Sequence, residues 1–152
     1  MQTNEPIRIS VRDQRLDFVA PDGSLTSYPV STSRFGVGFE NGSFKTPLGR
    51  FRICEKIGAG LPNDTIFVGR IPLGLDEPQP ATEDRILSRI LWLEGLEEQN
   101  ANTRERFIYI HGTPREAQIG RPASHGCIRM KRADLLALFD AVSLGAGVVI
   151  EP

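Results

Sequence analysis

The sequence predicts a mainly β fold, a sandwich with one α-helix in the C-terminal half of the chain. The 152 residues include 15 glycines and 11 prolines, and show only modest helical periodicity. Short segments in which apolar and polar residues alternate are separated by turn-forming residues, which is typical of many short strands. One segment near the C-terminus, residues 132–142, has apolar side chains at helical spacing. A sandwich with a single packed helix accommodates both patterns.

Length and charge limit the domain organisation and the class of partner. A chain of 152 residues is the size of one domain, so we expect a single domain over residues 1–152. The 18 basic and 19 acidic residues give a net charge of -1 without a basic stripe, which argues against a nucleic-acid partner. No apolar run approaches the length of a membrane span. The sequence does not indicate an oligomeric state.

Two features bear on the compartment. The first residues lack the basic and apolar segments of a secretory signal. Cys54 and Cys127 lie far apart in sequence, and two unpaired thiols fit a reducing compartment. We therefore expect a cytoplasmic location, or a periplasmic one if an export signal has been removed from the natural chain.

The N-terminal third predicts three strands followed by a long loop. Residues 7–11 and 16–18 alternate in polarity and form a β-hairpin. A third strand is expected over 25–30, with Pro29 near its end, where a missing amide donor does least harm. Residues 31–49 are rich in glycine and poor in aliphatic side chains. They predict a long loop, which is either functional or a plain connection.

The middle of the chain continues with short strands. A strand is expected over 51–57, in which Cys54 is a small buried side chain. The turn-rich residues 58–64 lack the Gly-Lys-Ser/Thr ending of a phosphate-binding loop, so we reject that function for them. A short apolar strand over 65–71 and a proline-rich loop over 72–80 follow.

Residues 82–93 are ambiguous. The polar residues 82–84 could cap a helix, whereas the apolar residues that follow suit a buried strand equally well. The polar stretch 94–106 predicts a surface loop that could border a cleft. Residues 107–110 predict a buried strand that ends at His111.

The C-terminal part predicts a helix and a last strand. The helix over 132–142 begins after Lys131, a weak N-cap, and is ended by Gly145. Residues 147–150 form the final strand.

The segment between Ile110 and Met130 contains the side chains suited to nucleophilic catalysis. It holds both histidines of the chain, His111 and His125, together with Cys127. A thiol attacks as its thiolate, a minor species at a reference pKa of about 8.5, and therefore needs a neighbouring base. A histidine meets that need. The segment predicts Cys127 as nucleophile and His111 as base.

These residues also resemble the signature of a known family. His111-Gly112, Ile119-Gly120 and the block Ser124-His125-Gly126-Cys127-Ile128-Arg129 are similar to the motif of the L,D-transpeptidase catalytic domain (YkuD-like). Upstream, residues 28–32 and 45–49 resemble its Pro-Val-Ser-Thr and Thr-Pro-x-Gly segments in the same order. The resemblance implies the β-sandwich fold of that family and favours a strand over residues 85–93.

The resemblance implies further roles in the site. The backbone carbonyl of Gly112 would fix the tautomer of His111, the role that aspartate has in serine proteases. The amides of Gly126 and Cys127 are candidates for the oxyanion hole. His125 either donates to the oxyanion, shapes the pocket or makes a structural hydrogen bond. Ser124 is expected to stabilise the loop through its hydroxyl.

Three cations are candidates for contact with an anionic substrate. Arg129 lies two residues after Cys127 and, in an extended chain, points to the same side. It either binds a substrate carboxylate or forms a structural ion pair. Arg121 and Lys45 are further candidates, although charged loop residues are usually just solvated.

The implied substrate is the peptide stem of peptidoglycan or a soluble muropeptide, cut between an L-configured centre of a diamino acid and a terminal D-alanine. The thioester on Cys127 passes either to water, as in an L,D-carboxypeptidase, or to an amine, as in a periplasmic transpeptidase that forms cross-links. We expect hydrolysis. No cofactor is implied, and a zinc site is disfavoured because a fourth ligand is not suitably spaced. A non-catalytic module that binds cell-wall peptides is a remote alternative.

Overall fold

The computed structural model describes residues 5–73 and 85–152, and within them the predicted mainly β fold with one α-helix is confirmed. The strands are β1 (Ile7–Ser10), β2 (Arg15–Val19), β3 (Leu25–Ser31), β4 (Gly49–Ile57), β5 (Ile66–Val68), β6 (Ile71–Pro72), β7 (Ile86–Gly95), β8 (Tyr109–Gly112), β9 (Ile128–Met130) and β10 (Gly147–Glu151). Two short 3-10 turns, η1 (Glu98–Asn100) and η2 (Glu116–Gln118), and the helix α1 (Arg132–Ala141) complete the fold.

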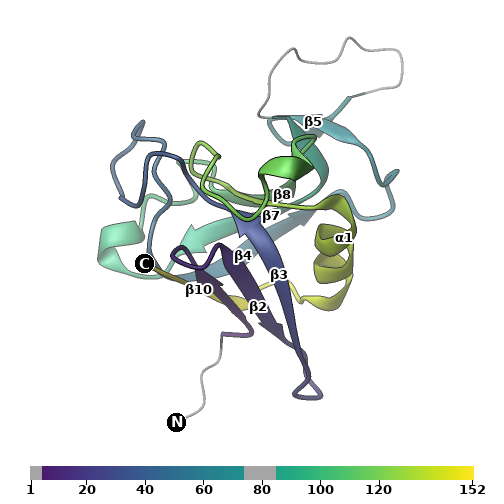
Figure 1. The fold of residues 1–152 in the computed structure, drawn as a ribbon, viewed down its shortest axis with the longest axis horizontal. Coiled ribbons are helices and arrows are strands. Elements are labelled where there is room, and N and C mark those ends of the chain that lie inside the picture. Colours follow the sequence, from purple (N-terminus) through teal and green to yellow (C-terminus); the bar gives the residue numbers. More distant parts are fainter. Residues whose placement is uncertain (1–4, 74–84) are drawn as a thin grey trace.

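The two layers of the predicted sandwich are joined into one continuous sheet. Its strand order is β4-β10-β1-β2-β3-β9-β8-β7, and an additional pairing between β4 and β7 closes the circuit. The hairpin β5–β6 extends from β7 at the outside of this circuit. In Figure 1, β2 and β10 lie in the lower part of the molecule, β7 and β8 lie above them, and β5 is at the top right.

The core fills the inside of the closed sheet. Alternate residues of the strands point inward and are almost fully buried, as are three residues of α1, Leu135, Leu138 and Phe139. Each buried aliphatic side chain contributes about 1.5–3 kcal/mol relative to an exposed one, so the register of the strands is firmly set. Ile110 of β8 and Ile128 of β9 pair side by side in this core. Their sequence neighbours therefore point to the opposite face of the sheet.

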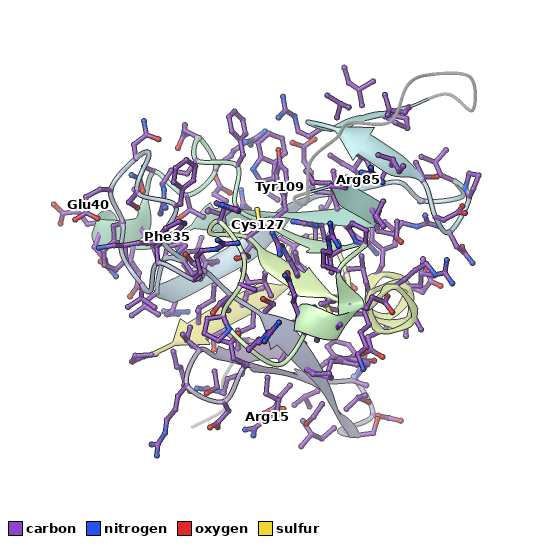
Figure 2. All side chains as sticks on the ribbon, turned by 45° about the horizontal axis from the view of Figure 1, so that its top comes forward. Arg15, Phe35, Glu40, Arg85, Tyr109 and Cys127 are labelled. Carbon is purple, nitrogen blue, oxygen red and sulfur yellow. The ribbon has the colours of Figure 1, made fainter. Side chains whose placement is uncertain are left out.

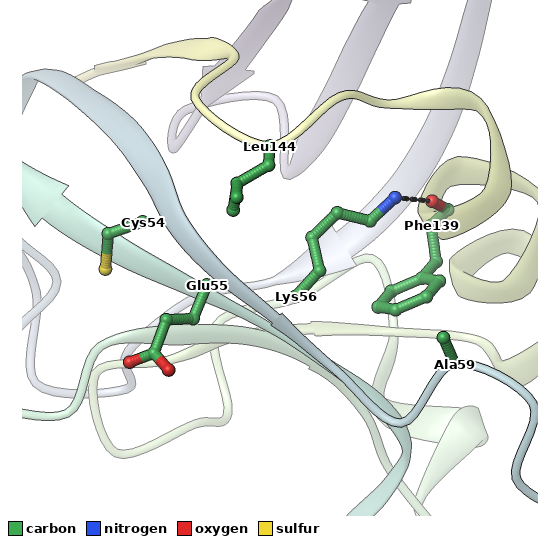
Figure 3. Close-up of a pocket in the computed structure, with 6 residues that line it drawn as sticks. All are labelled: Cys54, Glu55, Lys56, Ala59, Phe139 and Leu144. Carbon is green, nitrogen blue, oxygen red and sulfur yellow. Dashed lines mark hydrogen bonds between the residues drawn. The ribbon is translucent and has the colours of Figure 1, made fainter.

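The helix is held at both ends by side chains from elsewhere in the chain. Lys131 makes no side-chain cap, as predicted, and the Arg132 amide instead donates to the Glu116 carboxylate at 2.7 Å. At the other end, the Lys56 ammonium donates to the Phe139 carbonyl at 2.6 Å (Figure 3). It also donates to the Val142 carbonyl at 2.7 Å. The helix ends at Ala141, where the extended Val142 interrupts it, rather than at Gly145.

The strand over residues 85–93 is confirmed as β7, and residues 32–48 form the predicted long loop. Two of the predicted strands were wrong in their extent. The strand over 65–71 is divided into β5 and β6 by a turn in which Gly69 has a φ of 62°. The strand over 107–110 begins only at Tyr109, because Phe107 has a φ of 58° and lies outside the sheet.

Two further points concern individual segments. The strand β8 continues to Gly112, so His111 lies within the strand and not at its end. Most of the predicted loop 72–80, and the possible cap at 82–84, fall outside the described residues. No helix in the described part of the chain is long and apolar enough to cross a membrane.

Candidate active site

The pairing of β8 with β9 brings the candidate catalytic residues to one face of the sheet. The two strands are parallel, and His111 is the partner of Arg129. Side chains of paired residues lie on the same face, as do those two residues apart along a strand. Tyr109 and Cys127 therefore lie on this face too, opposite the core. Figure 2 shows the Cys127 sulfur close to Tyr109.

The Cys127 thiol is held by the backbone of the segment that enters β8. Its S–H donates to the Phe107 carbonyl at 3.3 Å, and its sulfur accepts the Tyr109 amide at 3.4 Å. Burial raises the pKa of the thiol to about 11, although the Tyr109 amide and the positive charge of Arg106 act in the opposite direction. Cys127 is therefore a neutral thiol in the resting protein near pH 7.

His111 is fixed by the carbonyl of its neighbour. Its Nδ1 lies 2.6 Å from the Gly112 carbonyl oxygen, the contact that the family resemblance implies. Because a carbonyl oxygen only accepts, Nδ1 carries the proton and Nε2 is left with a free lone pair. The side chain is 3% exposed, and burial lowers its pKa to about 4, against the opposing effect of this hydrogen bond. His111 is a neutral base.

The raised pKa of the thiol and the lowered pKa of the imidazole both favour neutral groups over a thiolate–imidazolium pair. Neither of the two hydrogen bonds of the Cys127 sulfur goes to His111. The S–H must turn from the Phe107 carbonyl towards the imidazole before it can transfer its proton. Catalytic hydrogen bonds commonly tighten only when substrate is bound. This arrangement suits a base that removes the proton during nucleophilic attack.

Ser124 and Gly126 shape the turn that precedes the nucleophile. The Ser124 hydroxyl donates to the Cys127 carbonyl at 2.6 Å and accepts the Gly126 amide at 3.2 Å. This is the loop-stabilising role expected for Ser124. The Gly126 amide is consequently occupied, whereas the Cys127 amide has no hydrogen-bond partner within the described residues. Of the two predicted oxyanion donors, Cys127 is the one that the geometry leaves available.

The long loop 32–48 packs directly against this turn. Gly126 has a φ of 117°, and a Cβ atom there would lie 3.3 Å from the Lys45 carbonyl and 3.5 Å from the Phe44 carbonyl. The Thr46 hydroxyl donates to the Gly126 carbonyl at 2.9 Å. Glycine at this position therefore meets a requirement of backbone conformation and of space. The loop therefore helps to position the turn that carries Cys127.

His125 is an exposed side chain at the rim of a small pocket. Its ring lies 5.7 Å from the rings of both Phe35 and Phe44, and its pKa is lowered by burial and then by the charge of Arg34. The pocket has a volume of about 200 Å³ and is lined by Asn41, Gly42, Phe44, Glu105, Arg106, Phe107, Ile108 and His125. His125 thus helps to form the wall of this pocket, one of the roles expected for it.

The three candidate cations are in different positions. Arg129 lies on the same face as Cys127, as expected, but it is 2% exposed and donates to the Gln118 side chain at 3.2 Å. Lys45 is half-buried, and its carbonyl accepts the Arg106 guanidinium at 2.6 Å. Arg121 is exposed. Burial and the bond to Gln118 favour a structural role for Arg129.

The second cysteine lies in a different environment. Cys54 occupies a bulge in β4, is half-buried, and donates to the Trp92 carbonyl at 3.4 Å. Figure 3 shows it in a second pocket of about 490 Å³, together with Glu55, Lys56, Ala59, Phe139 and Leu144. No histidine lines this pocket, so Cys54 has no imidazole base beside it. Its expected role as a packed side chain stands, although it is less buried than predicted.

The sequence alone did not identify several residues around the thiol. Arg106 supplies positive charge near Cys127, and its guanidinium joins the segment before β8 to the loop 32–48 through the carbonyls of Gly38 and Lys45. Tyr109 and Trp92 belong to a small apolar cluster that Cys127 packs against. In the sequence, an arginine before a strand and aromatic residues within strands have ordinary structural explanations. Arg106, Tyr109 and Trp92 are therefore recognised as part of the site only because the structure places them near the thiol.

Comparison with known proteins agrees with this geometry. The model of the YkuD family, the L,D-transpeptidase catalytic domain, matches residues 5–150. The chain is 42% identical over 48 residues to the protein YqjB of Bacillus subtilis (strain 168), an alignment that covers 32% of this chain and 27% of that protein.

Solved structures show the same fold. An L,D-transpeptidase from Xylanimonas cellulosilytica has a TM-score of 0.63 at 19% identity, covering 99% of this chain and 63% of that one. L,D-transpeptidase 3 of Mycobacterium tuberculosis, in complex with a faropenem-derived adduct, has a TM-score of 0.62 at 18% identity, covering 96% and 59%. The chain thus spans less than two thirds of the length of each. Since the family model matches almost the whole sequence, the chain belongs to the YkuD family of L,D-transpeptidase catalytic domains.

Proposed function

We propose that this domain is a cysteine acyltransferase that acts on the peptide stems of peptidoglycan. The observation that carries the proposal is the hydrogen bond from His111 Nδ1 to the Gly112 carbonyl, on the sheet face that also holds Cys127. It leaves Nε2 as a neutral base on the same sheet face as the Cys127 thiol. The membership of the YkuD family supports the substrate class.

The proposed reaction begins with attack on the carbonyl of the L-configured centre. A bond forms between Cys127 Sγ and the carbonyl carbon while the thiol proton moves to His111 Nε2. The Cys127 amide donates to the developing oxyanion. The bond to the terminal D-alanine then breaks, its nitrogen takes the proton from His111, and a thioester remains on Cys127.

We infer that the thioester is passed to water, which makes the domain an L,D-carboxypeptidase of recycled muropeptides. The two free cysteines fit a reducing compartment such as the cytoplasm. In that compartment the stems are soluble fragments, and water at bulk concentration outcompetes dilute amines. A periplasmic transpeptidase that forms cross-links is the alternative fate of the same intermediate.

A product assay distinguishes these outcomes. The purified protein is incubated with a soluble tetrapeptide muropeptide, with and without a large excess of an amine acceptor, and the products are analysed by mass spectrometry. Tripeptide and free D-alanine support hydrolysis. Cross-linked dimer or an exchanged D-amino acid as the main product overturns hydrolysis in favour of transpeptidation, and unchanged substrate contradicts the proposed activity.

A further inference from the structure

Arg70 lies in the turn between β5 and β6 and reaches over the sheet face that holds the nucleophile. Its guanidinium carbon is 4.9 Å from the centre of the Trp92 ring and 5.0 Å from that of Phe107. Its Nη1 donates to the Tyr109 hydroxyl at 3.1 Å. An exposed arginine is thereby held in a defined position by three aromatic side chains.

Two of these aromatic residues are also the ones that hold the thiol. The backbone carbonyl of Phe107 and the backbone amide of Tyr109 contact the Cys127 sulfur. Arg70 and Cys127 therefore contact opposite ends of Tyr109, its hydroxyl and its amide. Tyr109 and Phe107 thus lie between the cation and the thiol, which do not contact each other directly.

The charge of Arg70 is uncompensated within residues 5–73 and 85–152, where none of the ion pairs involves it. Arg104 provides a contrast, since its guanidinium lies 5.0 Å from the same Trp92 ring but donates to Glu55 at 3.1 Å. A guanidinium that lies over an aromatic ring still has N–H groups along its edge that can donate to a planar anion. The geometry of Arg70 suits a carboxylate bound by two parallel hydrogen bonds.

Two carboxylates of a peptidoglycan stem can lie on the residues that flank the bond to be cut. That of the terminal D-alanine lies next to the bond that breaks, whereas a diamino acid with a second carboxylate places it at the far end of its side chain. Because Arg70 is linked to the thiol only through Tyr109 and Phe107, it suits the farther carboxylate. Arg129, for which the sequence suggested either a substrate carboxylate or a structural ion pair, is buried and bonded to Gln118.

We propose that Arg70 binds the distal carboxylate of the diamino acid in the donor stem. The domain then prefers stems with a free carboxylate at this position over stems with an amide there or with lysine. This inference rests on the proposed function, because it requires that a peptidoglycan stem is the donor.

The test measures binding separately from turnover. In a Cys127→Ala background, calorimetry gives the Kd of three tetrapeptide stems, which contain meso-diaminopimelate, the same residue with its distal carboxylate amidated, or lysine. We expect the first to bind about 10- to 100-fold more tightly than the other two, as for a charged hydrogen-bonded pair. Arg70→Gln should abolish the preference, and Arg70→Lys should retain only part of it.

Arg104→Gln is the matched control, because this arginine stacks on the same ring but is paired with Glu55. It should keep the preference. Equal affinity of the three stems, or a preference that survives Arg70→Gln, overturns the inference. A carboxylate preference in binding without turnover of any stem by the wild-type protein supports the subsite while contradicting the proposed function.

Discussion

In the proposed reaction, the protonation state of His111 determines how acylation depends on pH. The imidazole accepts a proton only as the neutral form, and its pKa is lowered to about 4 by burial. We predict that the acid limb of kcat/KM lies near pH 4, well below the ordinary range of histidine. The measurement is the rate of Cys127 acylation from pH 3.5 to 8, with circular dichroism at each pH to verify folding. A limb near pH 6.5 would show that His111 is not the base in the state described.

The same residue links pH to stability. Between pH 6.5 and about 4 the unfolded chain binds a proton at His111 that the folded chain does not, so stability falls as the pH is lowered through this window. The lowered pKa of His111 corresponds to a loss of about 3 kcal/mol in the free energy of unfolding at the acid end of this window. His111→Gln should remove this part of the loss. The free energy of unfolding by urea at pH 4, 5 and 7 tests it, and parallel curves for the two proteins would be evidence against a buried neutral imidazole.

Ser124 is expected to affect both the stability of the protein and the rate of Cys127 acylation, because it holds the turn that carries Cys127. Its hydroxyl is fully buried and bridges the Cys127 carbonyl and the Gly126 amide. Ser124→Ala leaves both partners unsatisfied, which should cost about 1–3 kcal/mol and slow acylation. Ser24→Ala is the control, because that hydroxyl bonds Asp22 in an exposed turn. Equal, small effects of the two substitutions on urea unfolding and acylation would refute the bridging role.

At the scale of elements, α1 depends on a cation contributed by β4. Lys56 donates to two carbonyls at the end of the helix, and its ammonium lies 4.5 Å from the centre of the Phe139 ring. Lys56→Met keeps the aliphatic part of the side chain but removes these interactions, which should cost about 1–2 kcal/mol. Thermal unfolding measures this cost. The exposed Lys131 makes no cap, so Lys131→Met should change stability by less than about 0.5 kcal/mol.

The elements also show which parts of the fold were predictable. Alternation of polarity located β1, β2 and β4, because one face of each strand is buried and the other is not. The division between β5 and β6 and the late start of β8 depend on positive φ angles at Gly69 and Phe107. A pattern of hydrophobicity does not report such angles, since Phe107 is as apolar as a strand residue and yet is 50% exposed.

For the whole molecule, the sequence predicted the candidate site best where its residues lie close together in the chain. Cys127, Gly126 and Ser124 follow one another in a turn, and His111 is in the strand beside it, so a short motif contains them all. Arg70 and Arg106 are in other segments and reach the thiol region only through the closure of the sheet and the packing of loops. Pairings of this kind are long-range, and a single sequence carries no signal for them.

The central claim is that Cys127 is the nucleophile of this domain, and intact-protein mass spectrometry with a carbapenem such as imipenem tests it most directly. A solved L,D-transpeptidase similar in fold to this chain is in complex with imipenem. We predict a single adduct, mapped to Cys127 by peptide analysis, absent from Cys127→Ala and formed orders of magnitude more slowly in His111→Gln. An adduct on Cys54, or equal labelling of wild type and Cys127→Ala, would contradict the claim.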